Sequence, residues 1–319
     1  MKPKASKALP VLFLSLGSLG AAALAGQTPR REPAVVELPG STRAMALGHA
    51  YQLGGRDPDA LFYNPALVER ARGISLGLHV LGDVSLAATL AASTEWLGGG
   101  VAVGVRAMEY ETFISEPGAG VPLRFVSGTR HDGLDAFLRE GNVGVSELVA
   151  TAAYGRRLLG VRVGLAGKLI DQRGGAERDR GFALDFGVSR DVGRATVGLA
   201  VQDLGPALEL GGEGRLPTRV TLGAGGYGKP VGPLDLGLAA AITRRADGEV
   251  IPGGGVEVGY WPVTGRTFVA RVGVRRVPEG EALPVTFGGS FWGDRLVLDY
   301  AFQAVDGAEG VHRVTLGWR

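Results

Sequence analysis

Apolar residues alternate with small or charged residues along most of this chain, from residue 73 to residue 319. Residues 161–170 read VRVGLAGKLI and residues 295–303 read RLVLDYAFQ. Successive side chains of a β-strand point to opposite faces, so each such segment has one apolar face and one small or polar face. The segments have about the 9–11 residues that a tilted strand needs to cross a bilayer. We predict strands at residues 73–81, 84–94, 100–111, 146–157, 160–171, 181–191, 194–203, 217–228, 233–244, 253–260, 266–276, 283–292, 295–303 and 311–319.

The links between these segments alternate between long and short. The long ones are residues 112–145, 172–180, 204–216, 245–252 and 277–282; the short ones are 158–159, 192–193, 229–232, 261–265 and 293–294. Only the first hairpin, at residues 82–83, departs from the alternation. Outer-membrane barrels have short turns on the periplasmic side and longer loops outside. The sequence therefore predicts an all-β fold, a transmembrane antiparallel β-barrel of about fourteen strands.

Composition favours a membrane barrel over a soluble extracellular β-protein. Of 319 residues, 54 are glycine, and many lie inside the predicted strands, where glycine weakens a strand in water. On the inward face of a barrel, glycine leaves room for a plug or a ligand. Aromatic residues also gather near strand ends, where an interfacial girdle is expected. These residues are Trp96, Tyr110, Tyr154, Tyr227, Tyr260, Trp261, Trp292 and Trp318.

The first residues predict an exported protein. Lys2, Lys4 and Lys7 precede an apolar stretch, residues 8–24, and Ala23-Leu24-Ala25 has the small-x-small pattern of a signal-peptidase site. We expect residues 1–25 to be a cleaved signal peptide and the protein to lie in the outer membrane of a Gram-negative bacterium. Removing three lysines from a chain of net charge +2 leaves the mature protein near −1, which argues against a nucleic-acid partner.

No motif in the chain supports an enzyme or a cofactor. There is no cysteine, and the four histidines are dispersed without the spacing of a metal site. Residues 73–77, GISLG, fit the nucleophile elbow of hydrolases, but they lie within a predicted strand and no helix follows. Residues 223–228, GAGGYG, fit a dinucleotide-binding pattern, but Lys229 and Pro230 come next in place of a helix.

The region before the barrel, residues 26–72, does not have the alternation of a strand. Asp57 before Pro58 predicts the start of a short helix, and Pro65 predicts its end. The residues that stand out in this region are Gly40, Arg43, Ala44, Met45, Gly48, Ala50 and Tyr51, then Asp57, Ala60, Asn64, Pro65 and Ala66.

In these residues the chain resembles the PorV/PorQ family and the related FadL-type channels for long-chain fatty acids. Residues 201–206 and the end of the chain, residues 299–317, are similar as well. The resemblance implies a fourteen-stranded barrel, residues 73–319, with residues 26–72 folded into the lumen as a hatch. His49 departs from the family pattern, which usually has glycine there, and so do Leu67, where a small residue is usual, and the ending Trp318-Arg319 in place of a terminal Phe.

Two sets of residues are candidates for function. In one interpretation the Asn-Pro-Ala stretch only positions the hatch, because Asn and Pro are ordinary turn residues; in the other it gates a path for an apolar ligand. The hatch and gating candidates are Arg43, Asp57, Phe62, Tyr63, Asn64, Pro65 and Ala66. The lumen-lining candidates, all on the predicted inward face, are Arg106, Arg162, Lys168, Asp185, Arg271 and Asp299.

The resemblance implies two functions, and the residues do not separate them. One is a channel for hydrophobic compounds such as long-chain fatty acids, with outer-membrane lipid around it. The other is a barrel that transports nothing and docks cargo or partners of a protein secretion apparatus, for which the long link at residues 112–145 is the natural element. An outer-membrane lipase or deacylase ranks third, because no Ser/His pair is evident.

Overall fold

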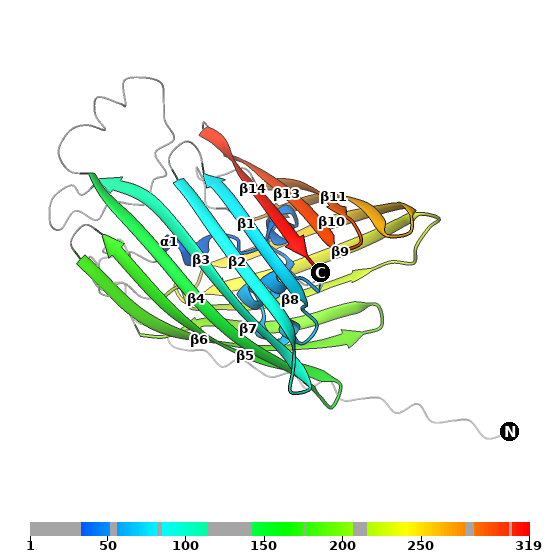
Figure 1. The fold of residues 1–319 in the computed structure, drawn as a ribbon, viewed down its shortest axis with the longest axis horizontal. Coiled ribbons are helices and arrows are strands. Elements are labelled where there is room, and N and C mark those ends of the chain that lie inside the picture. Colours follow the sequence, from blue (N-terminus) through cyan, green and yellow to red (C-terminus); the bar gives the residue numbers. More distant parts are fainter. Residues whose placement is uncertain are drawn as a thin grey trace.

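A computed structural model describes residues 33–51, 56–81, 85–113, 142–174, 177–206, 216–277, 284–305 and 308–319. Within these ranges, antiparallel strands β1 to β14 form one closed barrel (Figure 1). Each strand pairs with its neighbours in the sequence, and β1 pairs with β14. The strands are β1 (Gly73–Leu81), β2 (Ser85–Trp96), β3 (Gly99–Phe113), β4 (Asn142–Leu158), β5 (Val161–Gly174), β6 (Glu177–Val192), β7 (Ala195–Leu204), β8 (Arg219–Tyr227), β9 (Leu234–Arg245), β10 (Val250–Val263), β11 (Arg266–Arg275), β12 (Val285–Trp292), β13 (Leu296–Val305) and β14 (Ala308–Trp318). The prediction of a fourteen-stranded barrel is confirmed.

The alternation in the sequence becomes two faces of the barrel wall. In β1, Leu76 and Leu78 are exposed on the outside while Ser75 and His79 are buried on the inside. The same holds for β5, where Leu165 and Leu169 are exposed and Ala166 and Lys168 are buried on the inside. The sheet is closed, so it has no unpaired strand edge, and its outer face is apolar. A β-structure that spans a bilayer requires both features.

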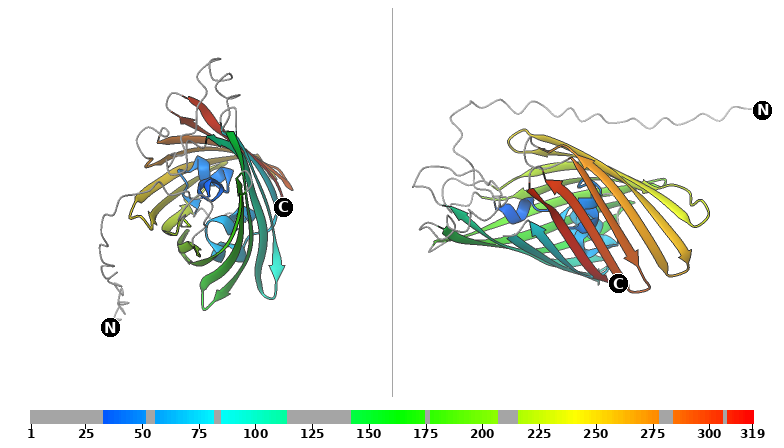
Figure 2. Two further views of the ribbon diagram at one scale, coloured as in Figure 1. Left: turned by 90° about the vertical axis from the view of Figure 1, so that its left-hand side faces the viewer. Right: turned by 90° about the horizontal axis from the view of Figure 1, so that it is seen from above.

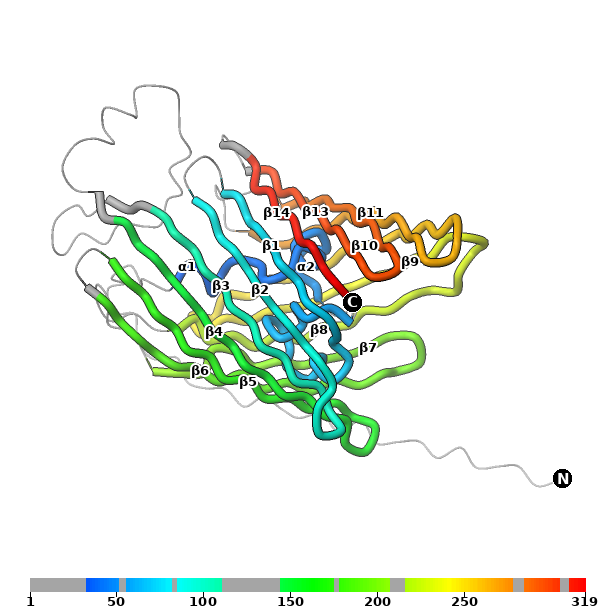
Figure 3. Tube along the Cα trace, in the orientation of Figure 1, coloured from blue at the N-terminus to red at the C-terminus, as the bar shows by residue number. Residues whose placement is uncertain are grey.

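Two of the links expected to be long are short. β5 runs to Gly174 and β6 begins at Glu177, and β9 ends at Arg245 with β10 beginning at Val250. Residues predicted as loop at these places instead continue the ladder, because polar side chains are accepted in a strand once it extends beyond the apolar belt. The short turns that join β2–β3, β4–β5 and β6–β7 lie together at one end, toward the right of Figure 3.

The described part of the region before β1 forms four short helices, which lie inside the ring of strands (Figure 2). We call residues 33–51 and 56–72 the N-terminal segment. Its helices are α1 (Ala34–Glu37), α2 (Thr42–Ala46), η2 (Pro58–Phe62) and η3 (Pro65–Glu69), the last two being 3-10 helices. Among the described residues, none of the helices is long and apolar enough to cross a membrane.

Local sequence sets where these helices begin. Ser41 caps α2 by accepting a hydrogen bond from the Ala44 amide at 3.4 Å, and Asn64 caps η3 by accepting one from the Ala66 amide at 2.9 Å. Pro58 and Pro65 stand at the first helical positions, where a missing N–H costs nothing. The predicted helix start at Asp57 and Pro58 holds, but Asp57 makes no capping bond, because its carboxylate binds arginines instead.

Candidate functional site

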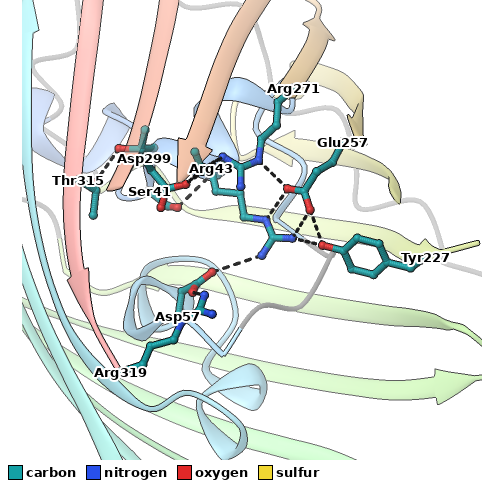
Figure 4. Close-up of polar contacts among 12 residues, drawn as sticks. Ser41, Arg43, Asp57, Tyr227, Glu257, Arg271, Asp299, Thr315 and Arg319 are labelled. Carbon is teal, nitrogen blue, oxygen red and sulfur yellow. Dashed lines mark hydrogen bonds and ion pairs between the residues drawn. The ribbon is translucent and has the colours of Figure 1, made fainter. Parts of the chain in front are cut away.

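The N-terminal segment meets the barrel wall through a buried ionic network centred on Arg43 of α2 (Figure 4). The guanidinium of Arg43 donates to the Glu257 carboxylate of β10 at 2.8 and 3.1 Å, and its Nη1 lies 3.4 Å from the Asp57 carboxylate. The Tyr227 hydroxyl of β8 contacts both Arg43 and Glu257. One arginine thus joins two parts of the N-terminal segment to two strands.

The network continues along the wall to the last residue of the chain. Arg271 of β11 donates to Glu257 at 2.5 Å and to Asp299 of β13 at 2.9 Å. Arg319 donates to Asp57 at 2.8 Å. We call these six residues, Arg43, Asp57, Glu257, Arg271, Asp299 and Arg319, the Arg43 network.

The Arg43 network contains three cations and three anions, so its formal charge is balanced. The guanidiniums of Arg43, Arg271 and Arg319 also lie 5.5, 5.9 and 5.3 Å from the ring centre of Trp292. Burying charge is costly unless each group keeps its partners, and loss of one partner leaves the other as an uncompensated buried charge. The network therefore holds the N-terminal segment in one position strongly, provided that all its members are in place.

Two carboxyl groups of the N-terminal segment have opposite pKa shifts. Burial acts to raise the pKa of Asp57, but the charges of Arg43 and Arg319 hold it below its usual value. Burial raises the pKa of Asp59 to about 7, against the smaller opposing effect of a hydrogen bond from the Ser75 hydroxyl. Asp57 is therefore an anion that belongs to the network, whereas Asp59 is a buried acid that carries a proton below about pH 7.

Asn64 fastens the other half of the segment to the wall. Its amide nitrogen lies 3.3 Å from the carbonyl oxygens of Val188 in β6 and of Leu199 in β7, while its side-chain oxygen caps η3. Backbone carbonyls are the partners because η3 lies flat against the strands.

The wall leaves room for this stretch by carrying glycine where η3 touches it. A Cβ atom at Gly187 would collide with the side-chain oxygen of Asn64, and one at Gly164 would collide with the backbone of Pro65 and Ala66. Glycines of β3 and β4 lie against η3, and those of β10, β11 and β12 lie against α2 and the turn after it. We call these residues the glycine floor: Gly100, Gly155, Gly164, Gly187, Gly253, Gly255, Gly273 and Gly288.

Phe62 and Tyr63 fill the space between the two halves of the segment. The carbonyl of Phe62 accepts a hydrogen bond from Gln202 at 2.9 Å, and its ring lies 5.1 Å from the guanidinium carbon of Arg106. Tyr63 stacks on Tyr51 with ring centres 4.6 Å apart and accepts a hydrogen bond from the Ser41 amide at 3.2 Å. These aromatic contacts link α2 to η2 and make the segment one packed body.

The lumen-lining candidates all face inward but fall into separate groups. Arg271 and Asp299 belong to the Arg43 network. Lys168 and Asp185 form a second group, in which the ammonium lies 2.8 Å from Asp185 and 2.5 Å from Asp203. Arg162 pairs with Asp191 at 2.8 Å, and Arg106 reaches the Val36 carbonyl at 3.4 Å.

Sequence reasoning left several participants out of the candidate set. Inward parity marks Glu257 as facing the lumen, and position 203 lies within a stretch that carries the family resemblance. Parity at the end of the last strand places Arg319 on the lumenal side as well. Asp59 and Tyr227 had no signal of this kind, because their roles depend on which strands close around the segment.

The space left between the segment and β1, β13 and β14 is small. A cavity of about 20 Å³, room for roughly one water, is lined by Arg43, Asp57, Asp59, Ser75 and Thr315 among others. Ser75, which the GISLG motif singled out, faces inward in β1 and donates to Asp59. His79 lies four residues farther along the same strand, about 13 Å away, so it is out of reach as a general base for Ser75. Within the described part of the chain, no group of three His, Asp or Glu residues is placed to hold a metal.

Comparison with known proteins identifies the fold and no more. No protein-family model and no curated protein matches the chain. Its structure is similar to the deltaS2S3 mutant of the monoaromatic hydrocarbon channel TodX, with a TM-score of 0.55 and 13% identity over 87% of this chain and 96% of that one. For the deltaS2 mutant of TodX the TM-score is 0.52, with 12% identity over 88% of this chain and 97% of that one. For a Pseudomonas aeruginosa FadL homologue the TM-score is 0.48, with 10% identity over 87% of this chain and 98% of that one.

Proposed function

We propose that the protein is an outer-membrane channel for hydrophobic compounds and that the N-terminal segment is its hatch. The observation that carries the proposal is a closed barrel with an apolar outer face, into which the segment is docked through the glycine floor and a charge-balanced network. The similarity of fold to channel barrels supports it. A Gram-negative outer membrane is the setting that such a barrel requires, reached with the signal peptide predicted for residues 1–25.

Passage through this barrel requires the hatch to move. The cavity beside Arg43 holds roughly one water, far less than a fatty acid or an aromatic hydrocarbon needs. Movement of α2 would break the contacts of Arg43 with Glu257, whereas movement of η3 would break those of Asn64 with β6 and β7. The described arrangement is therefore the closed state of the proposed channel.

A reversible tether between the hatch and the wall tests this mechanism. The hydroxyl oxygens of Thr42 in α2 and Thr315 in β14 are 2.6 Å apart, so the variant Thr42→Cys/Thr315→Cys places two thiols within reach of a disulfide. The chain has no other cysteine. We expect oxidised cells to take up a fluorescent fatty acid no faster than cells lacking the protein, and a reductant to restore the rate.

The single variants Thr42→Cys and Thr315→Cys are the controls, and neither should respond to oxidation. Unchanged uptake by the fully oxidised double variant would show that the compound passes without movement of α2. A rate equal to that of cells lacking the protein in every variant and in the wild type would refute the channel itself.

The substrate class has two sources of support. The sequence resemblance implies long-chain fatty acids, and the TodX structures are named for monoaromatic hydrocarbons. Measuring uptake of a fluorescent fatty acid and of radiolabelled toluene in the same cells separates these classes.

Docking of secretion-system proteins remains a proposal from the PorV/PorQ resemblance alone. Of the loop suggested for it, residues 114–141 lie outside the described residues, and no contact in the described part of the chain favours it. Native mass spectrometry of the purified protein would detect a bound partner of that kind.

A further inference from the structure

Three arginines gather on the outer face of the barrel where β5 and β6 run beyond the apolar belt. Leu169 pairs with Phe182 across these strands, and both are among the more exposed apolar side chains, at 68% and 56%. The next outward pair along the strands is Asp171 and Arg180, and the one after it is Arg173 and Arg178. We call Asp171, Arg173, Arg178 and Arg180 the β5–β6 arginine cluster.

The arginines of this cluster converge on one carboxylate. Arg173 and Arg180 each reach Asp171 through Nε, at 3.2 and 3.0 Å, and Arg178 reaches it through Nε at 3.0 Å and through Nη2. The three side chains remain 57%, 65% and 41% exposed for Arg173, Arg180 and Arg178. Among the described residues, the Nη atoms of Arg173 and Arg180 have no hydrogen-bond partner.

The cluster carries three positive charges and one negative charge, so it has a net charge of +2 on a small exposed surface. Among the side chains that the structure describes, the neighbouring outward positions do not neutralise it: Ser146 lies beside Arg173 on β4, and the carboxylate of Glu109 lies one strand farther away on β3. Strands are about 4.8 Å apart, so Glu109 is about 10 Å from Arg173. Within the described part of the chain, three guanidiniums therefore share one carboxylate, and an anion from outside the protein would relieve the repulsion between them.

The position of the cluster indicates what that partner is. The link between β5 and β6 is at the same end of the barrel as the long link between β3 and β4, the end that lies outside the membrane in such barrels. The arginines begin one residue pair beyond Leu169 and Phe182, at the depth where lipid hydrocarbon gives way to headgroups. Guanidinium forks match phosphate oxygens in geometry as well as in charge.

We infer that the β5–β6 arginine cluster binds the phosphate of a phosphorylated lipid in the outer leaflet, with Leu169 and Phe182 against the acyl chains. The inference rests on the proposed membrane setting but not on transport. Asp171 organises the three guanidiniums in the absence of lipid and competes with the phosphate for them.

Lipid retention by the purified full-length barrel in neutral phosphatidylcholine nanodiscs tests this binding. Diphosphorylated lipid A and its dephosphorylated form are added, and native mass spectrometry counts the lipid retained. Each Arg contact near a membrane surface contributes about 1 kcal/mol, which corresponds to about fivefold in affinity. We expect Arg178→Gln to weaken retention about fivefold and Arg178→Gln/Arg180→Gln about thirtyfold, and no variant should retain the dephosphorylated lipid.

Asp171→Asn distinguishes lipid binding from a purely structural ion cluster. Removing the competing carboxylate should strengthen retention of lipid A, whereas a cluster that merely stabilises the hairpin would lose order and retain less. Arg244→Gln is the matched control, since Arg244 is an exposed outward arginine at the same end of the barrel but on β9. It should leave retention unchanged.

Equal retention of the two lipids, weaker retention by Asp171→Asn, or equally tight binding of free inorganic phosphate would overturn the inference. Fatty-acid uptake measured in the same variants keeps the two proposals apart. A barrel that retains lipid A but takes up no fatty acid would support this site and refute the channel. A barrel that takes up fatty acid but does not retain lipid A would support the channel and refute this site.

Discussion

At the scale of single residues, the most consequential group is the buried acid Asp59. Its pKa lies near 7 in the folded protein because of burial, compared with 3.8 for an ordinary aspartate. Between about pH 4 and pH 7 the folded state keeps a proton that the unfolded chain has released. The free energy of unfolding therefore falls as the pH rises through this window, by about 1.4 kcal/mol for each pKa unit at most.

We expect Asp59→Asn to abolish this fall, because asparagine stays neutral at every pH while it still accepts a hydrogen bond from Ser75. The measurement is the urea midpoint at pH 5 and at pH 8, read from the gel mobility of unheated samples. Relative to Asp59→Asn, the wild type should lose stability between pH 5 and pH 8, because the other titrating groups are common to both proteins. A difference between the two midpoints that is the same at both pH values would contradict the assignment.

His49 occupies a backbone conformation that suits glycine. Its φ is 66°, in the left-handed region, directly after Gly48 at 61°. The family pattern that the sequence resembles usually has glycine at this position, and a left-handed backbone conformation suits glycine. Left-handed backbone costs a residue with a Cβ about 1–2 kcal/mol.

His49→Gly should therefore raise the free energy of unfolding by about 1 kcal/mol. His49→Ala removes the same imidazole but keeps the Cβ, so it should give no gain. Urea unfolding of the two variants side by side is the measurement, and equal midpoints for Gly and Ala would show that the left-handed backbone at this position has no measurable cost.

The sequence predicts which strand residues face the lumen, but it does not predict which side chains those residues contact. The alternation in residues 161–170 places Lys168 on the inner face, where it is buried. Its contact with Asp203 depends on a register irregularity in the β6–β7 pair and on a left-handed conformation at Asp203 itself. Neither feature has a signature in the residue order.

At the scale of elements, the sequence predicts the strands better than it predicts the length of the links between them or the number of short helices. Apolar alternation stops where the bilayer would stop, but the ladder of β5 and β6 continues to Gly174 and Glu177 with charged residues. Similarly, Pro58 and Pro65 predict one short helix and its end. The structure has two 3-10 helices, because Asn64 caps a second one.

Gly187 of the glycine floor on β6 and Gly167, which lies outside the floor on β5, give a matched pair of substitutions. Gly187→Ala places a methyl group on the side chain of Asn64, so η3 must shift from the wall. Gly167→Ala on β5 meets nothing within 4 Å. Overpacking costs about 1–3 kcal/mol, so we expect that loss for Gly187→Ala and a change within about 0.5 kcal/mol for Gly167→Ala.

Limited proteolysis of the purified barrel should detect the displaced η3 in Gly187→Ala as faster cleavage between β1 and the signal-peptidase site. The urea midpoint gives the free energy. Equal behaviour of the two alanine variants would mean that the wall does not hold η3 in the way described.

At the scale of the whole molecule, the barrel does not need the segment to complete its hydrogen bonding. Each strand is paired on both sides, including β1 with β14, and none of these pairings includes a residue of the segment. A variant lacking residues 40–67 should therefore still form a barrel with heat-modifiable gel mobility, though with a lower urea midpoint.

That deletion should also leave a water-filled lumen. In a planar bilayer we expect discrete ion-conductance steps from the deletion variant and none, or far smaller ones, from the wild type. Conductance of equal size in both would mean that the segment does not fill the lumen, even if the deleted barrel is fully folded.

The segment also contacts the first and the last strand of the barrel. Asp59 accepts from Ser75 in β1, while the Gly40 carbonyl accepts from Arg313 in β14 at 3.1 Å and Thr42 bonds Thr315 in the same strand. Pairing of β1 with β14 joins the two most distant strands in the sequence, so it carries the largest loop-closure entropy in the sheet. Because the segment is covalently continuous with β1 and bonded to β14, it links the two strands of this seam, so its contacts add to the ladder that closes the barrel.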